Sequence, residues 1–220
     1  MLSGQEGLLE IVLLTLEVTG AALLIACLTG IPAGAGLALT RLKGREAVLA
    51  VVYTGMGFPP VVIGLLVYLL LSRSGPLGSL GWLFTPPAMV VAQVILAFPL
   101  VAGLTSTSIA SLDPEFRLQV RSLGATPRQE VLAMLHEARI GVVAAVAAGF
   151  GAIISEVGAA MLVGGNIAGQ TRVLSTAVVL ETRRGNFGLA LVLGGILLAL
   201  ALAANVIIVR IQGGRHWWPR

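Results

Sequence analysis

Residues 112–139 read LDPEFRLQVRSLGATPRQEVLAMLHEAR and form the one long polar passage in a chain that is otherwise mostly apolar. Asp113 precedes a proline, which predicts a helix start because Asp accepts hydrogen bonds from free amides and proline suits the first helical position. Gly124 predicts a left-handed turn that ends this helix. Thr126 and Gln129 have the spacing of a capping box that begins a second helix. The passage therefore predicts a helical hairpin joined by a tight turn.

The composition around this hairpin is that of a membrane protein. Hydrophobic residues make up 57% of the chain and charged residues 11%, whereas soluble domains contain about 25% charged residues. Apolar runs recur at close to the ~20 residues that a helix needs to cross a bilayer. We therefore predict an all-α integral membrane protein, with residues 1–220 as a single domain. The lone Cys27 has no His or Cys nearby, so we expect neither a metal site nor an intrachain disulfide.

Five apolar segments are long enough to be membrane-spanning helices. They cover about residues 8–39, 47–71, 87–108, 140–163 and 187–209. The first is interrupted by Pro32 and by glycines on either side of it. No basic residue precedes this segment, so we expect a retained helix rather than a cleavable signal peptide. No inverted repeat is visible, which disfavours the common architectures of secondary transporters.

The distribution of Lys and Arg predicts the orientation of these spans. The first connection, the third connection and the C-terminal tail share one side of the membrane and carry ten of the fourteen basic residues. These are Arg41, Lys43, Arg45, Arg117, Arg121, Arg128, Arg139, Arg210, Arg215 and Arg220. We therefore expect the N-terminus outside, and the hairpin and C-terminus in the cytoplasm, with Trp217 and Trp218 as interfacial anchors. The net charge of +4 then reflects topology, and no nucleic-acid partner is expected.

The second span contains a break at Gly57-Phe58-Pro59-Pro60. Proline lacks an amide hydrogen and clashes with the preceding turn, so the helix must kink or open at this point. Within lipid, the freed backbone groups are tolerated only where protein or a water-filled cavity satisfies them. The break therefore indicates a gate or constriction on a transport path, or else a packing kink.

Glu156 lies inside the fourth predicted span. An ionisable residue at this depth costs ~2.5–3.5 kcal/mol on insertion scales, so it is retained for a reason. That reason is either a functional site or an interhelical hydrogen bond that holds the bundle together. Small residues at Gly141, Ala145 and Gly149 give the same span a face for close helix packing.

Beyond this span, residues 164–171 contain several glycines, which permit backbone conformations that other residues resist. The apolar run 173–180 that follows is too short to span a bilayer. We interpret this segment as a structured outer lip with a re-entrant or interfacial helix, and a plain loop is the alternative.

Two faces are predicted for the first helix of the hairpin. Phe116, Val120 and Leu123 share one face, whereas Arg117 and Arg121 share another. One face can pack against the membrane domain while the other meets a partner. The alternative is an amphipathic loop that lies on lipid headgroups.

These motifs together resemble those of the permease subunits of ATP-binding-cassette importers, most closely those for molybdate and tungstate, over nearly the whole chain. The family's cytoplasmic loop carries Glu-Ala-Ala, three further residues and a glycine, and residues 122–126 match the region around that glycine. The loop departs from the pattern in two places, where Leu118-Gln119-Val120 replaces Glu-Ala-Ala and His136-Glu137 replaces a Leu-Pro. Further similarity lies in residues 58–64, 75–78, 156–159 and 165–171. Residues 136–139 and 171–182 are more similar to the tungstate branch.

The resemblance implies the type I importer fold and a homodimer with the pore at the subunit interface. It also implies a separate cytoplasmic ATPase dimer that holds ATP and Mg, and an extracytoplasmic oxyanion-binding protein. The chain has no phosphate-binding loop of the Gly-x-x-x-x-Gly-Lys-Ser/Thr type, so we expect no enzyme activity and no cofactor in this chain. The implied function is ATP-driven import of tungstate, then molybdate, across the inner membrane of a prokaryote. Another anion such as sulfate is the alternative, followed by a secondary anion transporter.

The resemblance also assigns candidate site residues, none of them catalytic. Those expected to couple to the ATPase lie in the cytoplasmic loop 109–139 and are Arg117, Arg121, Ser122, Leu123, Gly124, Ala125, Thr126 and Pro127. Those expected at the pore or gate are Phe58, Pro59, Pro60, Gly64, Glu156, Gly165 and Asn166. In the implied cycle of alternating access, ATP-driven closure of the ATPase moves the hairpin and opens the outer side, and hydrolysis resets the gate near Pro59. A carboxylate would repel a dianion, so we expect Glu156 to hold helix geometry or to pair with a basic or hydroxyl group.

Overall fold

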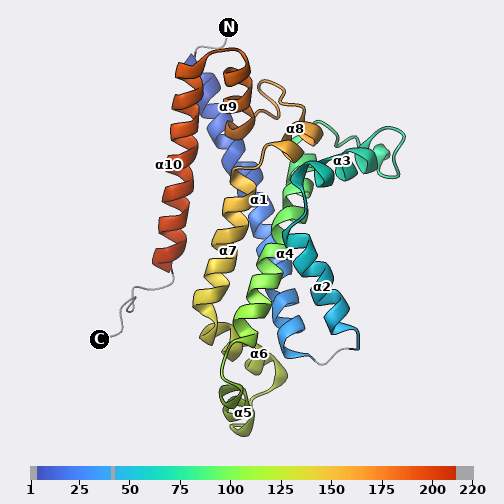
Figure 1. Ribbon diagram of the computed structural model, residues 1–220, viewed down its shortest axis with the longest axis vertical. Helices are drawn as coiled ribbons and strands as arrows, with labels where there is room; N and C mark the ends of the chain where they lie inside the picture. The colour runs from blue at the N-terminus through green and yellow to red at the C-terminus, as the bar shows by residue number, and fades with distance from the viewer. Residues whose placement is uncertain (1–3, 41–42, 212–220) are drawn as a thin grey trace.

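The computed structural model describes residues 4–40 and 43–211, and no residue in these ranges belongs to a β-strand. Arg41, Arg215 and Arg220, which entered the charge count, and the predicted anchors Trp217 and Trp218 lie outside the described residues. The elements, shown in Figure 1, are α1 (Gly4–Leu39), α2 (Arg45–Met56), α3 (Pro60–Leu71), the 3₁₀ helix η1 (Gly78–Leu80), α4 (Pro86–Ala110), α5 (Pro114–Ser122), α6 (Pro127–Glu137), α7 (Arg139–Ile154), α8 (Gly158–Gly164), α9 (Leu174–Arg183) and α10 (Phe187–Ile211).

Three helices, α1, α4 and α10, are each long and apolar enough to cross a membrane. The count rises to five if the bent pairs α2–α3 and α6–α7 each form one span. The predicted segments 87–108 and 187–209 match α4 and α10 closely. In Figure 1, α1 and α4 run downward beside each other and end near the α5–α6 hairpin, whereas α2 and α7 run back upward. The helical architecture therefore agrees with the sequence, and the differences lie in where individual spans break.

The first span is one continuous helix despite the glycines and proline that interrupt its apolar run. Pro32 lies within α1, where proline removes a backbone hydrogen bond. On either side of it, Gly30 and Gly34 pack directly against α4, and a Cβ at Gly30 would stand 3.3 Å from the amide of Ala102. The small residues therefore allow α4 to support α1 along the turn that the proline weakens.

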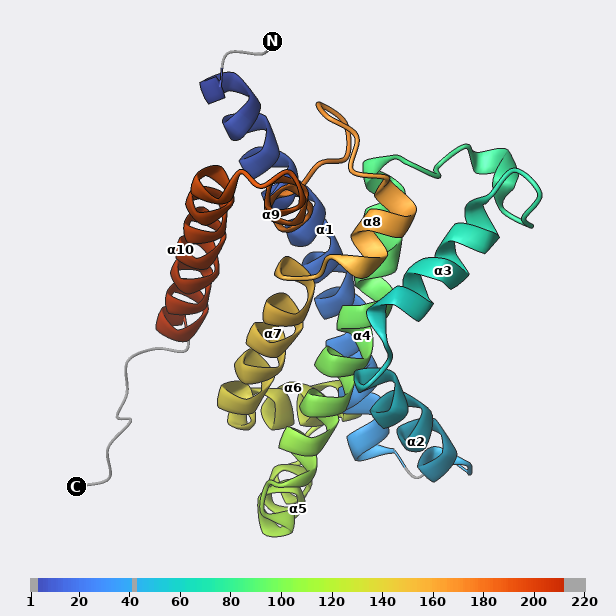
Figure 2. The same cartoon turned by 45° about the horizontal axis from the view of Figure 1, so that its top comes forward.

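The second span breaks where the sequence predicted. α2 ends at Met56, α3 begins at Pro60, and the two axes differ in direction by 103°. Pro59 is extended, with φ −63° and ψ 120°, and Pro60 occupies the first helical position, which suits its fixed φ and missing amide hydrogen. α3 consequently leaves the bundle sideways in both Figure 1 and Figure 2.

The fourth span is not the continuous helix that the sequence predicted for residues 140–163. α7 ends at Ile154, residues 155–157 are not helical, and α8 begins at Gly158. The predicted small-residue face is confirmed on α7, where Gly149 packs against Val101 of α4 and Ala145 is fully buried. Glu156 therefore lies in a break between two helices rather than inside one.

The segment after α8 is a structured lip that contains a short helix, as predicted. Its turn places Gly165 and Asn166 in the left-handed region, with φ values of 72° and 53°. α9 follows and buries Leu174 and Ala177 in a small apolar cluster with Leu193 of α10. In Figure 2, α9 lies between the upper parts of α1 and α10.

Candidate functional site: the polar hairpin and the two broken spans

The local structure of the hairpin is the one that its sequence predicted. Asp113 caps α5 by accepting a hydrogen bond of 2.8 Å from the amide of Glu115. Thr126 and Gln129 form a complete capping box at the start of α6. Gly124 joins the helices with φ 80°, a left-handed value that glycine adopts without a steric penalty. The two short helices therefore hold their turn in one conformation.

The apolar face of α5 differs in part from its prediction. Phe116 and Val120 pack, as expected, against a buried cluster that contains Met134 of α6 and Ala35 of α1. Leu123 does not join them and is 88% exposed. α5 ends at Ser122, and Leu123 is its C-cap at the start of the turn. The helical periodicity that had placed Leu123 on the packed face therefore does not extend to this residue.

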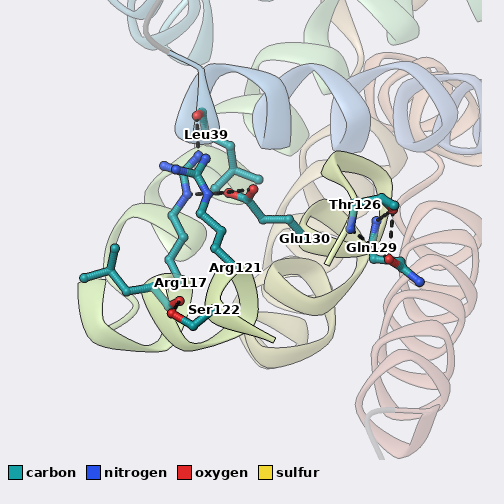
Figure 3. Close-up of polar contacts among 8 residues, drawn as sticks. Leu39, Arg117, Arg121, Ser122, Thr126, Gln129 and Glu130 are labelled. Carbon is teal, nitrogen blue, oxygen red and sulfur yellow. Dashed lines mark hydrogen bonds and ion pairs between the residues drawn. The ribbon is translucent and has the colours of Figure 1, made fainter. Parts of the chain in front are cut away.

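The arginine face of α5 turns inward onto Glu130 of α6, as Figure 3 shows. Arg117 Nε donates to Glu130 Oε1 at 2.5 Å, and Arg121 Nε donates to Glu130 Oε2 at 2.9 Å. Arg117 also donates through Nη2 to the backbone carbonyl of Leu39 at 2.6 Å. Both arginines were predicted to meet a partner, but the structure commits Arg117 to contacts within the chain.

Glu130 is buried, with 7% of its surface exposed, and it binds one guanidinium at each carboxylate oxygen. The hydrogen bond from Arg121, helped by Arg117, holds the pKa of the Glu130 carboxyl below its usual range, and burial opposes this shift only in part. Removing one partner of such a cluster leaves an uncompensated charge, which is costly when buried. Glu130 was not among the predicted site residues. The available signal was an acidic residue on the helix facing the two arginines.

The hairpin leaves three large apolar side chains open beside exposed polar ones such as Arg121 and Arg128. We define these three, Leu118 of α5, Leu123 after it and Leu132 of α6, as the apolar apex. These side chains are 62%, 88% and 57% exposed, respectively. Gly124 lies at the turn, with no other atom within 4 Å of a Cβ placed there. The remaining predicted coupling residues surround this turn: Ser122, Thr126 and Pro127 are exposed and Ala125 is half-buried. The turn from Ser122 to Pro127 is therefore accessible, and Leu123 is its exposed large apolar side chain.

The breaks in the second and fourth spans come together in space, where α3 crosses α8. Gly64 packs on Ala159, and Val61 packs on Gly158. This crossing joins the predicted gate at Pro60 to the predicted site at Glu156. Phe58, Pro59 and Pro60 stay on the surface of the chain, with Phe58 38% exposed.

Glu156 binds backbone amides at the start of α8, on the C-terminal side of its break. Its Oε1 accepts from the amide of Ala159 at 2.8 Å, and its Oε2 accepts from the amide of Ala160 at 2.9 Å. The backbone carbonyl of Glu156 accepts a hydrogen bond of 2.8 Å from Ser175 Oγ of α9. The side chain is buried and fixes the start of α8, which is the helix-holding role that the sequence suggested. These contacts leave neither carboxylate oxygen facing open space.

Gly165 and Asn166 lie apart from this crossing, at the far end of α8. Asn166 is held by Arg172, whose Nε and Nη2 donate to Asn166 Oδ1 and to its carbonyl, each at 3.3 Å. Thr171, which is fully buried, donates to the carbonyl of Gly164 and accepts from the amide of Ile167. The predicted pore residues therefore form two groups, one at the crossing of α3 and α8 and one in the structured lip after α8.

A further buried polar residue, Gln93 of α4, was missed by the sequence analysis. Its Nε2 donates to the carbonyl of Ile153 at 3.4 Å, next to the break that contains Glu156. Its Oε1 has no hydrogen-bond partner in the part of the chain that the structure describes. A lone amide inside the apolar third span was the signal that could have identified it.

Sequence comparison places the chain among known proteins. Residues 30–214 match the family model for the binding-protein-dependent transport system inner membrane component. A probable anion ABC transporter permease protein of Haloferax volcanii is 40% identical over 93% of this chain and 90% of that protein. The tungstate uptake system permease protein TupB of Peptoclostridium acidaminophilum is 36% identical over 92% of this chain and 89% of its own length.

Among solved structures, an inward-facing conformation of the MetNI methionine ABC transporter matches with a TM-score of 0.76 and 23% identity. The match covers 96% of this chain and 99% of the other, so the two share the type I importer permease fold. The family match begins in the last third of α1 and extends past the end of α10, and therefore includes the hairpin, both breaks and the structured lip. The chain belongs to the family of inner membrane components of binding-protein-dependent transport systems.

Proposed function

We propose that this chain is the membrane-spanning permease subunit of an ATP-binding-cassette importer for an oxyanion, with tungstate as the first candidate and molybdate as the second. The relatives named as anion and tungstate permeases support this substrate class. Tungstate and molybdate are both tetrahedral dianions, so a pore that passes one can accept the other. ATP and Mg bind in a separate ATPase subunit, and this chain contributes no catalytic residue.

The observation that carries the proposal is the exposed apolar apex of the hairpin. Leu118 is exposed on α5, and Leu123 is exposed at the turn between α5 and α6. Exposed leucines on two short capped helices are suited to dock into an apolar groove of another protein. In the proposed importer, the groove belongs to the ATPase, and the turn between α5 and α6 docks into it.

The broken spans supply a moving part for such a cycle. The Phe58-Pro59-Pro60 segment is exposed, and in the homodimer that we propose it lines the pore opposite the same segment of the second copy. The crossing of α3 and α8 links it to Glu156. Glu156 is not a substrate ligand, because its oxygens bind helix amides and its charge would repel a dianion. Selectivity for the anion then rests largely on an extracytoplasmic binding protein.

The orientation follows from the positive-inside rule. Among described residues outside the hairpin, Lys43, Arg45 and Arg210 lie on the side that we assign to the cytoplasm of a prokaryote. With this assignment the N-terminus is outside, the hairpin faces the ATPase, and the outer lip faces the binding protein. The protein is a multi-pass component of the inner membrane.

Replacing Gly124 tests the coupling role. The permease is reconstituted with its ATPase and binding protein, and ATP hydrolysis and anion uptake are measured for Gly124→Trp. Gly185→Trp is the matched control, because Gly185 is also left-handed and has no atom within 4 Å of its Cβ position. We expect Gly124→Trp alone to lose stimulation of the ATPase and uptake. Normal hydrolysis and uptake in Gly124→Trp would refute the coupling assignment.

The substrate is tested through the partner binding protein and through uptake. Calorimetry with tungstate, molybdate and sulfate ranks the three anions, and competition in vesicles checks the ranking in the complete transporter. A preference for sulfate would identify sulfate, and not tungstate or molybdate, as the substrate. Uptake by the permease without any ATPase would instead indicate a secondary anion transporter.

A further inference from the structure

We infer that α1 carries motion from the hairpin to the outer lip, through hydrogen bonds at its last residue and at Thr15 in its first half. This inference rests on the proposed importer function. At one end, Arg117 of the hairpin holds the carbonyl of Leu39, the last residue of α1. In the first half of α1, the side chain of Thr15 accepts a hydrogen bond from the amide of Leu174, the first residue of α9.

The inner attachment uses carbonyls that a helix end leaves without partners. Arg117 Nη2 donates to Leu39 O at 2.6 Å, and Arg45 Nε of α2 donates to Leu37 O at 2.5 Å. Both bonds are charge-assisted and lie at the negative end of the helix dipole, which strengthens them. Glu130 fixes Arg117 against α6, as Figure 3 shows, so a displacement of the hairpin acts directly on the α1 backbone.

The middle of α1 is supported against bending. Pro32 removes a hydrogen bond from the helix interior, and an unsupported helix would kink there. The contacts of Gly30 and Gly34 with Val101, Ala102 and Thr105 press α4 against this turn. At ~1.5 Å per residue, the distance from Thr15 to Leu39 is roughly 36 Å along the axis. α1 and α4 therefore span most of a bilayer as one stiff pair.

The outer attachment is a buried bond between helices that are far apart in sequence. Thr15 is 2% exposed, and its Oγ1 accepts from the amide of Leu174 at 2.9 Å while donating to the carbonyl of Ile11 at 2.6 Å. The amide of Leu174 belongs to the first turn of α9, so it has no partner within that helix. Thr176 of α9 accepts from the amide of Val173, and Thr15 supplies from α1 the acceptor for the next amide, that of Leu174.

The contacts continue from α9 to the broken fourth span. Ser175, next to Leu174, donates through Oγ to the carbonyl of Glu156 at 2.8 Å. A shift of α1 therefore moves α9, and α9 acts on the junction between α7 and α8. The link gives the outer lip a mechanical connection to the hairpin that does not pass through the pore lining.

The test uses three variants of the complete transporter with its ATPase and binding protein. Thr15→Val removes the hydroxyl at nearly constant volume, Thr15→Ser retains it, and Thr29→Val is the matched control. Thr29 lies on the same helix, is exposed, and bonds only to the carbonyl of Ile25 in its own helix. We expect Thr15→Val to raise the ATP hydrolysed per anion imported at least about threefold, the factor that corresponds to an average interhelical hydrogen bond in a membrane. Thr15→Ser and Thr29→Val should keep the wild-type ratio.

A distance measurement keeps the inference testable if Thr15→Val fails to assemble. Spin labels at Thr40 and Thr182, both exposed, report the ends of α1 and α9 in a Cys27→Ala background. Because α1 and α9 move as one unit, we expect the distance between the two labels to be the same in the nucleotide-free and in the ATP-trapped transporter. Thr15 is unchanged in this labelled protein. A change between the two states would overturn the inference, as would normal coupling in Thr15→Val or lost coupling in Thr15→Ser. Absence of any uptake by the wild type would instead refute the importer function itself.

Discussion

Gly64 of α3 lies directly against Ala159 of α8, so closely that a Cβ added to Gly64 would stand 2.6 Å from the Cα of Ala159. This contact is where the two broken spans meet. Neither helix can approach the other with a larger residue at this position, because the neighbouring atom belongs to the backbone and cannot rotate away. The geometry of the proposed gate therefore depends on glycine at position 64, which has no side chain.

Gly64→Ala should destabilise the permease, although Gly→Ala in a helix interior is favourable by ~1 kcal/mol when space allows. Overpacking of this kind costs ~1–3 kcal/mol. Gly20→Ala on α1 is the matched control, since a Cβ at Gly20 meets no atom within 4 Å. Thermal unfolding in detergent can be monitored by the reaction of a thiol dye with the half-buried Cys27. We expect a lower melting temperature for Gly64→Ala only. Equal melting temperatures would show that α3 and α8 separate easily.

Glu130→Gln should loosen the hairpin, because Arg117 and Arg121 would lose the only carboxylate that they share in the described part of the chain. Arg121 is 54% exposed at its side chain, so solvent compensates part of the loss. We expect trypsin to cleave after these arginines several times faster than in the wild type. Glu115→Gln, at an exposed position on α5, should cleave at the wild-type rate. Unchanged protection in Glu130→Gln would mean that apolar packing alone holds the hairpin.

The hairpin should also lose stability in acid. The arginine contacts lower the pKa of Glu130 in the folded state below its ordinary value of 4.5. The unfolded chain then binds the proton more readily, so the ion cluster contributes fully above about pH 4.5 and is lost as the pH falls through the lower folded pKa. The melting temperature measured across this range should fall more steeply in the wild type than in Glu130→Gln. Parallel curves for the two proteins would show that protonation of Glu130 does not cause the loss of stability in acid.

Glu156→Gln should weaken the start of α8 without changing anion preference. A glutamine offers one acceptor where the carboxylate binds the amides of both Ala159 and Ala160. Leaving one buried amide unpaired costs ~1–3 kcal/mol. We expect a lower melting temperature and a lower uptake rate, with an unchanged ratio of tungstate to molybdate transport in competition assays. A changed ratio would indicate that the carboxylate faces the substrate.

Features set by neighbouring residues were predictable from the sequence. The caps at Asp113 and Thr126, the turn at Gly124 and the break before Pro60 all follow from backbone chemistry within a few positions. The corresponding elements lie where the sequence placed them. The same holds for the long apolar helices α4 and α10, whose composition alone indicates a span.

Features set by packing were not predictable in this way. The bond between Arg117 and Glu130 depends on how α5 and α6 face each other, which no spacing rule specifies. The break in the fourth span contains neither glycine nor proline, and it exists because Glu156 captures two amides of the next helix. The exposure of Leu123 depends on where α5 ends, to within one residue.

The inward turn of Arg117 has a consequence for how the permease responds to its ionic environment. Dissolved salt screens exposed charges within about 10 Å at 0.1 M, but it does not weaken the burial of leucine side chains, and some salts strengthen it. The apex that the hairpin offers for docking consists of Leu118, Leu123 and Leu132. We therefore expect the leucine contacts between the hairpin and the ATPase to persist when the salt concentration of the cell rises, whereas any contact made by the exposed Arg121 and Arg128 is screened.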